Sequence, residues 1–193
     1  ARILKTAIDL FSQQGYDAVS MRDLAAAVGI KAASLYKHYR SKEEMLERIF
    51  QEYRDMMNQS SQFDDVLLRS PQTRSPKAFL TESFQAFKAM ILTPRMLKIT
   101  RIITMEQTRN ASVRDFFYAE MVEKPIAQFT ALFQQMQRSG QIRETDPAML
   151  ARTYHAFIIA LYYTNNFLVA DPELPQIKAE MLRFIDFFCD TLL

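Results

Sequence analysis

The side chains best suited to chemistry in this sequence are the basic ones between Ser20 and Lys42. Five basic residues and one acid give that stretch a local net charge of +4, whereas the whole chain of 193 residues carries +2. Clustered cationic side chains bind nucleic-acid phosphates, because each neutralised phosphate releases a condensed counterion. A sequence pI of about 8.7 is only mildly basic, so the predicted phosphate-binding surface is local. Its basic residues are Arg22, Lys31, Lys37, Arg40 and Lys42.

Catalytic chemistry has little support in the same sequence. The two histidines, His38 and His155, fall in different predicted domains, and there is no glycine-rich phosphate loop and no HExxH or CxxC spacing. Enzymes that use metals or nucleotides carry such patterns. We therefore predict no enzyme activity, no metal and no cofactor. A purely structural helical adaptor would leave the basic stretch without a purpose.

Two short helices joined by a tight turn would position the basic residues. Ser20 is a favourable N-cap and Asp23 puts negative charge at the positive end of the helix dipole, so one helix should begin at about Met21. Gly29 can adopt the positive φ that ends a helix, and a second helix should follow over about 32–39. The apolar residues between them are Leu24, Ala25, Val28, Ile30 and Leu35. This pattern predicts a helix-turn-helix; the alternative is a solvated helical hairpin in an all-α protein.

The segment GIKAASLYKHYRSKEEML, with the helix before it, resembles the DNA-binding domain of the TetR family of bacterial one-component regulators. As in that family, the helix-turn-helix is followed by an aromatic residue, Tyr39, and by Ser41-Lys42-Glu43 at the start of the next helix. The resemblance covers about residues 3–50. A capping serine is common in the family where this chain has Lys31.

The resemblance also implies which residues bind DNA. Tyr36, Lys37 and His38 correspond to the positions that meet DNA, and Lys42 corresponds to a phosphate contact. Together with polar and basic neighbours on the same helices they form the predicted DNA-binding set, which is Ser20, Arg22, Lys31, Ser34, Tyr36, Lys37, His38 and Lys42.

The rest of the chain reads as almost entirely helical. Glycine is scarce, each of the three copies stands where a helix should stop, and no alternating strand pattern occurs. We predict an all-α fold of about nine helices, with a three-helix helix-turn-helix domain over 1–45 and a helical effector-binding and dimerisation domain over 46–193. The expected helices are 3–14, 21–28, 32–39, 41–59, 76–92, 94–108, 113–139 with a kink at Pro125, 147–168 and 175–192. Over 58–75 we expect a loop with a short helical piece at most.

The last two helices are apolar on more than one face, which a helix on the outside of a monomer should not be. We expect them to form a four-helix bundle with the same helices of a second chain. The last helix adds Leu182, Ile185 and Phe187 outside its main apolar stripe. The predicted dimer interface comprises Phe157, Leu161, Phe184, Phe188 and Leu192; the alternative is a helix buried inside one domain.

The helices between about 76 and 139 are rich in methionine and aromatic residues. Methionine adapts to irregular shapes, so this composition suits a pocket for an apolar or aromatic ligand, although an ordinary core would look alike. Polar candidates on these helices and the next include Arg101, Glu106, Tyr118 and His155. The predicted ligand-binding set is Phe87, Arg101, Met105, Phe117, Tyr118, Met121 and His155.

The resemblance implies a dimeric transcriptional regulator, a repressor that a small apolar or aromatic effector releases from a near-palindromic operator in double-stranded DNA. The long helix that begins at Lys42 would be the lever between ligand and DNA. The alternative is a DNA-binding regulator without a small-molecule ligand, controlled by a partner protein. The longest apolar run, 156–163, is too short to span a bilayer, so we expect a cytoplasmic protein with no membrane contact.

Overall fold

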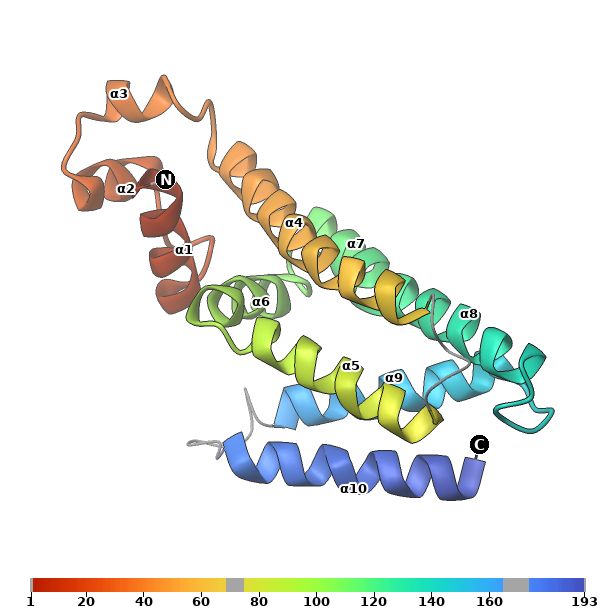
Figure 1. The fold of residues 1–193 in the computed structure, drawn as a ribbon. Coiled ribbons are helices and arrows are strands. Elements are labelled where there is room, and N and C mark those ends of the chain that lie inside the picture. Colours follow the sequence, from red (N-terminus) through yellow and green to blue (C-terminus); the bar gives the residue numbers. More distant parts are fainter. Residues whose placement is uncertain (1, 69–74, 165–173, 193) are drawn as a thin grey trace. The chain divides into compact units, whose positions relative to one another are not determined.

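The computed structural model describes residues 2–68, 75–164 and 174–192, and within these ranges every regular element is a helix (Figure 1). This confirms the predicted all-α fold. The elements are α1 (Arg2–Gln14), α2 (Met21–Val28), α3 (Ala32–Tyr36), α4 (Lys42–Leu68), α5 (Pro76–Ile91), α6 (Pro94–Glu106), α7 (Ala111–Phe117), the π-helix η2 (Tyr118–Glu123), α8 (Lys124–Arg138), α9 (Pro147–Tyr163) and α10 (Leu174–Leu192).

Three helices begin at the predicted positions 76, 94 and 147, each with a proline that follows a capping residue. The side chains of Ser75, Thr93 and Asp146 each accept a hydrogen bond from a backbone amide two or three residues on, at distances of 2.9–3.3 Å. Proline fits the next position because the missing N–H would have no partner inside the helix. These starts therefore follow from local sequence alone.

Two predicted helix ends were wrong. Helix α3 ends at Tyr36 rather than Tyr39, because the Leu35 carbonyl accepts from the amides of both His38 (2.9 Å) and Tyr39 (3.0 Å) and closes the helix into a turn. Helix α4 continues to Leu68, where a loop was predicted from residue 58 onwards. Residues 58–68 are mostly polar but contain neither glycine nor proline, so nothing in them stops a helix. Part of the predicted loop, 69–74, lies outside the described residues.

The predicted 113–139 helix is divided in the structure. It starts at Ala111, two residues earlier than predicted, because the Asn110 side chain accepts from the Val113 amide at 3.3 Å. Pro125 does not end the helical run, as predicted, but a π-helix precedes it. The predicted end of the 147–168 helix falls on residues outside the described part of the chain.

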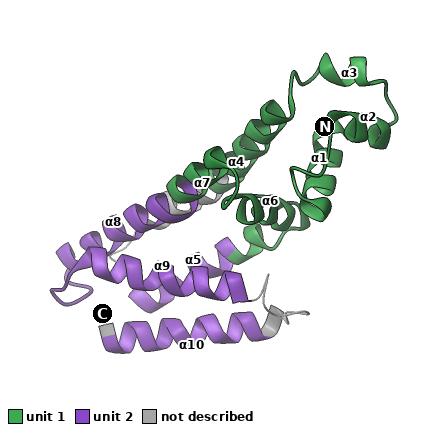
Figure 2. Cartoon of the chain, turned by 180° about the vertical axis from the view of Figure 1, so that it is seen from behind, with its two compact units in different colours: residues 1–61, 88–119 green, residues 62–87, 120–193 purple. Residues whose placement is uncertain are grey.

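The chain packs as two compact units, residues 1–61 with 88–119 and residues 62–87 with 120–193 (Figure 2). The first unit holds α1 to α3, α6 and α7 and most of α4. The second holds most of α5, and α8 to α10 around one apolar core. These two units are defined by how the residues pack. The predicted boundary at residue 45 instead divides DNA binding from effector binding and dimerisation, so it remains a prediction. In the described ranges, none of the helices has the length and apolar character needed to cross a membrane.

Candidate nucleic-acid interface

The start of α2 is fixed by a reciprocal capping box. The Ser20 Oγ accepts from the Asp23 amide at 3.2 Å, and the Asp23 carboxylate accepts from the Ser20 amide at 2.8 Å and from the Ser20 hydroxyl at 2.6 Å. These hydrogen bonds lower the pKa of Asp23 below its usual value. The ionised carboxylate therefore complements the positive end of α2. Ser20, a predicted DNA contact, thus uses its hydroxyl in the cap.

The turn between α2 and α3 follows from Gly29. Its φ of 76° lies in the left-handed region, and the amides of Gly29 and Ile30 each donate to a carbonyl of the last turn of α2 at 3.0 Å. Lys31 provides no side-chain cap for α3. The backbone carbonyl of Lys31 instead accepts from the amides of Ser34 (2.9 Å) and Leu35 (3.2 Å). Helix α3 therefore begins where predicted without the usual capping side chain.

Helix α3 is anchored by one residue and exposed elsewhere. Leu35 is fully buried, whereas Tyr36 remains 49% exposed. The predicted DNA contacts of α3 and the turn after it are each exposed to solvent in the first unit. The exposed members of the predicted set are Ser20, Arg22, Lys31, Ser34, Tyr36, Lys37 and His38.

Lys42, the remaining member, is half-buried and already engaged. It is the first residue of α4, and its Nζ donates to the Tyr16 carbonyl at 2.8 Å and lies 4.1 Å from the centre of the Tyr16 ring. Tyr16 is buried, and its hydroxyl donates to Glu43 Oε1 at 3.4 Å. Sequence reasoning missed Tyr16. The available signal was an aromatic residue directly after Gly15, which ends α1.

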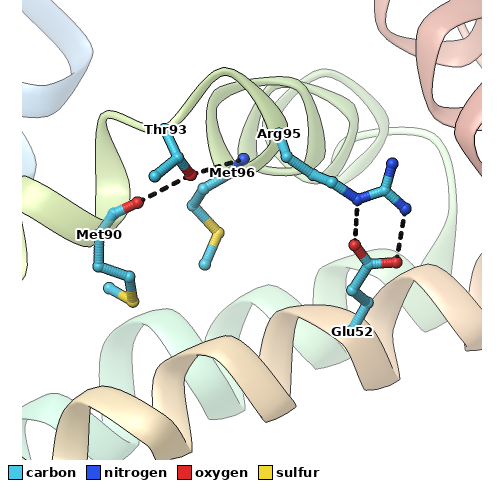
Figure 3. Close-up of polar contacts among 5 residues, drawn as sticks. All are labelled: Glu52, Met90, Thr93, Arg95 and Met96. Atoms are coloured by element: carbon cyan, nitrogen blue, oxygen red, sulfur yellow. Dashed lines mark hydrogen bonds and ion pairs between the residues drawn. The ribbon is translucent and has the colours of Figure 1, made fainter.

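Helix α6 is joined to both α1 and α4 by ion pairs within the first unit. Lys98 Nζ lies 2.6 Å from Asp9 Oδ1 on α1. Arg95 binds Glu52 on α4 through two nitrogens, and the second of these, Nη2, lies 2.7 Å from Glu52 Oε2 (Figure 3). Paired N–H···O bonds fix the direction of approach as well as the partner. The three helices are therefore held in register by polar contacts as well as by apolar packing.

The predicted ligand-binding residues are divided between the two units. Arg101, Met105 and Tyr118 are exposed on the first unit, which also holds the half-buried Phe117. The second unit holds Phe87, half-buried, and the buried pair Met121 and His155. Only this last pair is brought into direct hydrogen-bonded contact among the described members. Glu106, a polar candidate from the sequence, bonds to Tyr16 instead.

The contact between His155 and Met121 follows from Pro125. A proline has no N–H, so it cannot donate to the carbonyl four residues earlier, which is that of Met121. His155 Nε2 lies 2.9 Å from this carbonyl oxygen and donates to it when that nitrogen is protonated. Burial lowers the pKa of His155, which favours the neutral ring. His155 therefore satisfies the backbone of its own unit, the alternative to a ligand contact.

The predicted dimer residues divide into a core group and a surface group. Phe157 and Phe184 are half-buried and stack face to face, with ring centres 3.8 Å apart. Leu161 is buried and Phe188 is 0% exposed, packed against Phe133 and Tyr154 of its own chain. The structure therefore does not offer Phe188 to a second chain. The side chain of Leu192 lies outside the described residues.

Phe187, one residue away, is a large apolar side chain that α10 exposes. It is 60% exposed, and Met149 on α9 is exposed as well. One position along a helix turns the side chain by about 100°, so the two neighbouring phenylalanines face opposite environments. The sequence placed Phe187 outside the main stripe but did not rank it as an interface residue.

The comparisons with known proteins agree with this architecture. Residues 3–49 match the family described as bacterial regulatory proteins, tetR family, and residues 78–191 match the C-terminal domain of the AefR-like transcriptional repressors. The second match alone covers more than half of the chain. The chain belongs to the TetR family. It is a transcriptional regulator rather than an enzyme, as predicted, and its helix-turn-helix is the DNA-binding domain of that family.

Two relatives illustrate the range of similarity. The chain is 41% identical over 69 residues to IcaR of Staphylococcus epidermidis, the negative transcriptional regulator of the biofilm operon icaADBC. The matched segment covers 36% of this chain and 34% of IcaR. The chain is also 25% identical over 186 residues to the HTH-type transcriptional regulator YerO of Bacillus subtilis, covering 94% of the chain and 62% of YerO. The matches thus span less than two thirds of either relative.

Solved structures of bacterial transcriptional regulators share the fold at low sequence identity. A regulator from Pseudomonas syringae superposes with a TM-score of 0.74 at 19% identity, covering 98% of this chain and 94% of that one. A protein from Saccharomonospora viridis, solved in complex with choline, gives 0.71 at 21% identity, covering 96% and 94%. These neighbours establish the fold and carry no information on the ligand of this chain.

Proposed function

We propose that this TetR-family regulator is a cytoplasmic homodimer that represses transcription from a near-palindromic operator and is released by a small apolar or aromatic effector. The observation that carries the proposal is the exposed surface of α3 and its following turn, anchored by the buried Leu35. A short helix that packs on its domain through one buried residue and is otherwise accessible can enter the major groove of B-DNA. The repressor relatives, such as IcaR, support the direction of regulation.

Within that surface the side chains divide by chemistry. Lys37 and His38 carry donors that can reach base edges, and Tyr36 presents a half-exposed phenol. Arg22 and Lys31 carry charge on α2 and on the turn, where they suit phosphates. Phosphate contacts fix orientation and supply salt-dependent affinity, whereas base contacts select the sequence.

In a dimer, each of the two chains contributes one α3 surface for DNA. Phe187, Met149 and the half-buried Phe157 and Phe184 provide apolar side chains on α9 and α10 for pairing across a two-fold axis. Pairing of the two helices from each chain makes a four-helix bundle. Such a dimer can hold two recognition helices about 34–36 Å apart, in successive major grooves.

Release by an effector needs an element that both sites influence. Helix α6 is bonded to α1 through Lys98 and to Glu52 of α4 through Arg95, so a shift of α6 would carry α4 with it. Ligand affinity and DNA affinity would then be reciprocally coupled, by about 1–3 kcal/mol. The alternative is a regulator controlled by a partner protein. In that case neither choline nor any small apolar or aromatic compound should raise the midpoint of thermal unfolding.

Selection of bound duplexes from a random pool tests the DNA-binding part of the proposal. We expect an enriched near-palindrome whose half-sites are about 10 bp apart, or a multiple of one helical turn. Enrichment of single half-sites without a fixed spacing would contradict the dimer. Failure to enrich any sequence would contradict operator recognition.

A further inference from the structure

A buried carboxyl group lies beside the turn that follows α1. Glu106, the last residue of α6, is only 4% exposed, and its Oε1 accepts from the Tyr16 amide at 3.1 Å. Its Oε2 is buried as well, with no hydrogen-bond partner among the described residues. Burying a carboxyl group with half of its acceptors unused is unfavourable. The position is therefore poorly explained by stability alone.

The backbone conformation of Gly15 orients the Tyr16 amide toward this carboxyl group. The Gly15 φ of 88° lies in the left-handed region, and this turn directs the next amide toward the end of α6. A Cβ built on Gly15 would lie 3.5 Å from Glu106 Oε1, so the backbone passes close to the acceptor. The Tyr16 ring is held separately, edge-on against Phe11 with ring centres 5.1 Å apart. Ring and amide together fix the orientation of the residue.

Lys42 contacts the carbonyl and ring of Tyr16, whereas Glu106 contacts its amide. The Tyr16 carbonyl accepts from Lys42 Nζ, and the ammonium group lies over the Tyr16 ring. An ammonium group has three N–H donors, so two remain for other acceptors. A lysine whose side chain is already ordered loses less rotamer freedom when it meets a phosphate than a free lysine does. Glu106, Tyr16 and Lys42 thus link the end of α6 to the start of α4.

We propose that Glu106 is a positioning residue for DNA binding: by holding Tyr16, it orders the Lys42 ammonium group for a backbone phosphate. This inference rests on the proposed DNA-binding function. It assigns to a residue 90 positions from Tyr16 an effect on DNA affinity without any contact with DNA. The effect should be independent of sequence, because a phosphate contact carries no base information.

A double-variant cycle tests the link. Binding to one duplex is followed by fluorescence anisotropy at several salt concentrations for the wild type, Glu106→Ala, Lys42→Ala and the double variant, each below its own unfolding temperature. We expect Glu106→Ala to weaken binding about 5- to 10-fold and to reduce the salt slope by about 1 per protomer. In the Lys42→Ala background it should cause no further loss. Losses that multiply in the double variant would overturn the proposal, as would unchanged affinity and slope.

Three further variants separate positioning from folding. Glu106→Gln keeps an oxygen acceptor for the Tyr16 amide, so it should bind within about twofold of the wild type, which an effect of charge alone would not allow. Thr104→Val changes another buried polar side chain of α6 and should leave the salt slope unchanged. If Glu106→Ala does not fold, Glu106→Asp replaces it: wild-type affinity and slope in that shorter variant would overturn the proposal. Absence of DNA binding by the wild type would instead overturn the proposed function.

Discussion

His155 Nε2 lies 2.9 Å from the carbonyl oxygen of Met121, the carbonyl to which Pro125 cannot donate. A proline inside a helical run thus leaves an acceptor that a histidine 34 residues away fills. The bond joins α9 to the π-helix η2 inside one packed unit.

We predict that removing this donor destabilises the protein. His155→Ala would remove this buried hydrogen bond to the Met121 carbonyl, at a cost of about 1–3 kcal/mol in the free energy of unfolding. His155→Gln offers an amide donor of similar reach and should lose less. Chemical denaturation of the three proteins at pH 7.5 measures the difference, and equal stability of all three would show that the bond contributes nothing.

The burial of the same histidine predicts a dependence on pH. Burial lowers the pKa of His155 in the folded state, so the unfolded chain, with a pKa near 6.5, binds the proton more readily. The contribution of neutral His155 is therefore complete above about pH 6.5 and is lost as the pH falls from there to the folded-state pKa. Unfolding measured between pH 7.5 and 5 should show a smaller decrease for His155→Gln, which does not titrate, than for the wild type. Parallel curves would contradict this assignment.

Phe187 and Phe188 should respond in opposite ways. Phe187→Glu places a charge on an exposed side chain and should shift the protein toward monomer, measured by sedimentation velocity, with little change in unfolding. Phe188→Ala removes a fully buried ring and should cost about 3–5 kcal/mol. Tyr36→Ser, an exposed aromatic on the other unit, is the control for Phe187. A Phe187→Glu protein that remains dimeric at micromolar concentration would exclude this face from the interface.

Lys37→Ala should change sequence preference more than overall affinity. A base-reading donor is worth about 1–3 kcal/mol on the preferred site and little on random duplex. Competition between the selected operator and random DNA measures the ratio for the wild type and the variant. Equal losses on both duplexes would assign Lys37 to the phosphates instead.

Local chemistry explains what could be predicted from the sequence. The caps at Ser20, Thr93 and Asp146 act within a few residues, so each helix start was evident without a fold. The extension of α4 to Leu68 was not predicted. The polar residues after position 57 indicated a loop, but the segment contains no glycine or proline that would end the helix. Family resemblance supplied Tyr36, Lys37, His38 and Lys42; the first three are exposed in the structure and Lys42 is half-buried.

Contacts between distant segments could not be predicted. Tyr16 meets Glu106 and Lys42 only because α6 and α4 pack beside the turn after α1. Phe188 was expected at a surface because its helix is apolar on two sides, and periodicity alone does not say which side the same chain covers. For the same reason the ligand set could be named by composition but only Met121 and His155 were found in contact.

The account depends most directly on the affinity of the purified wild-type protein for double-stranded DNA as a function of salt. We expect clear binding of a random duplex at low salt, with the logarithm of the binding constant falling linearly as the logarithm of the salt concentration rises. A selected near-palindrome should bind at least about 10³ times more tightly than the random duplex at the same salt. No measurable attraction to either duplex at low salt would contradict the central claim that the α3 surface binds DNA.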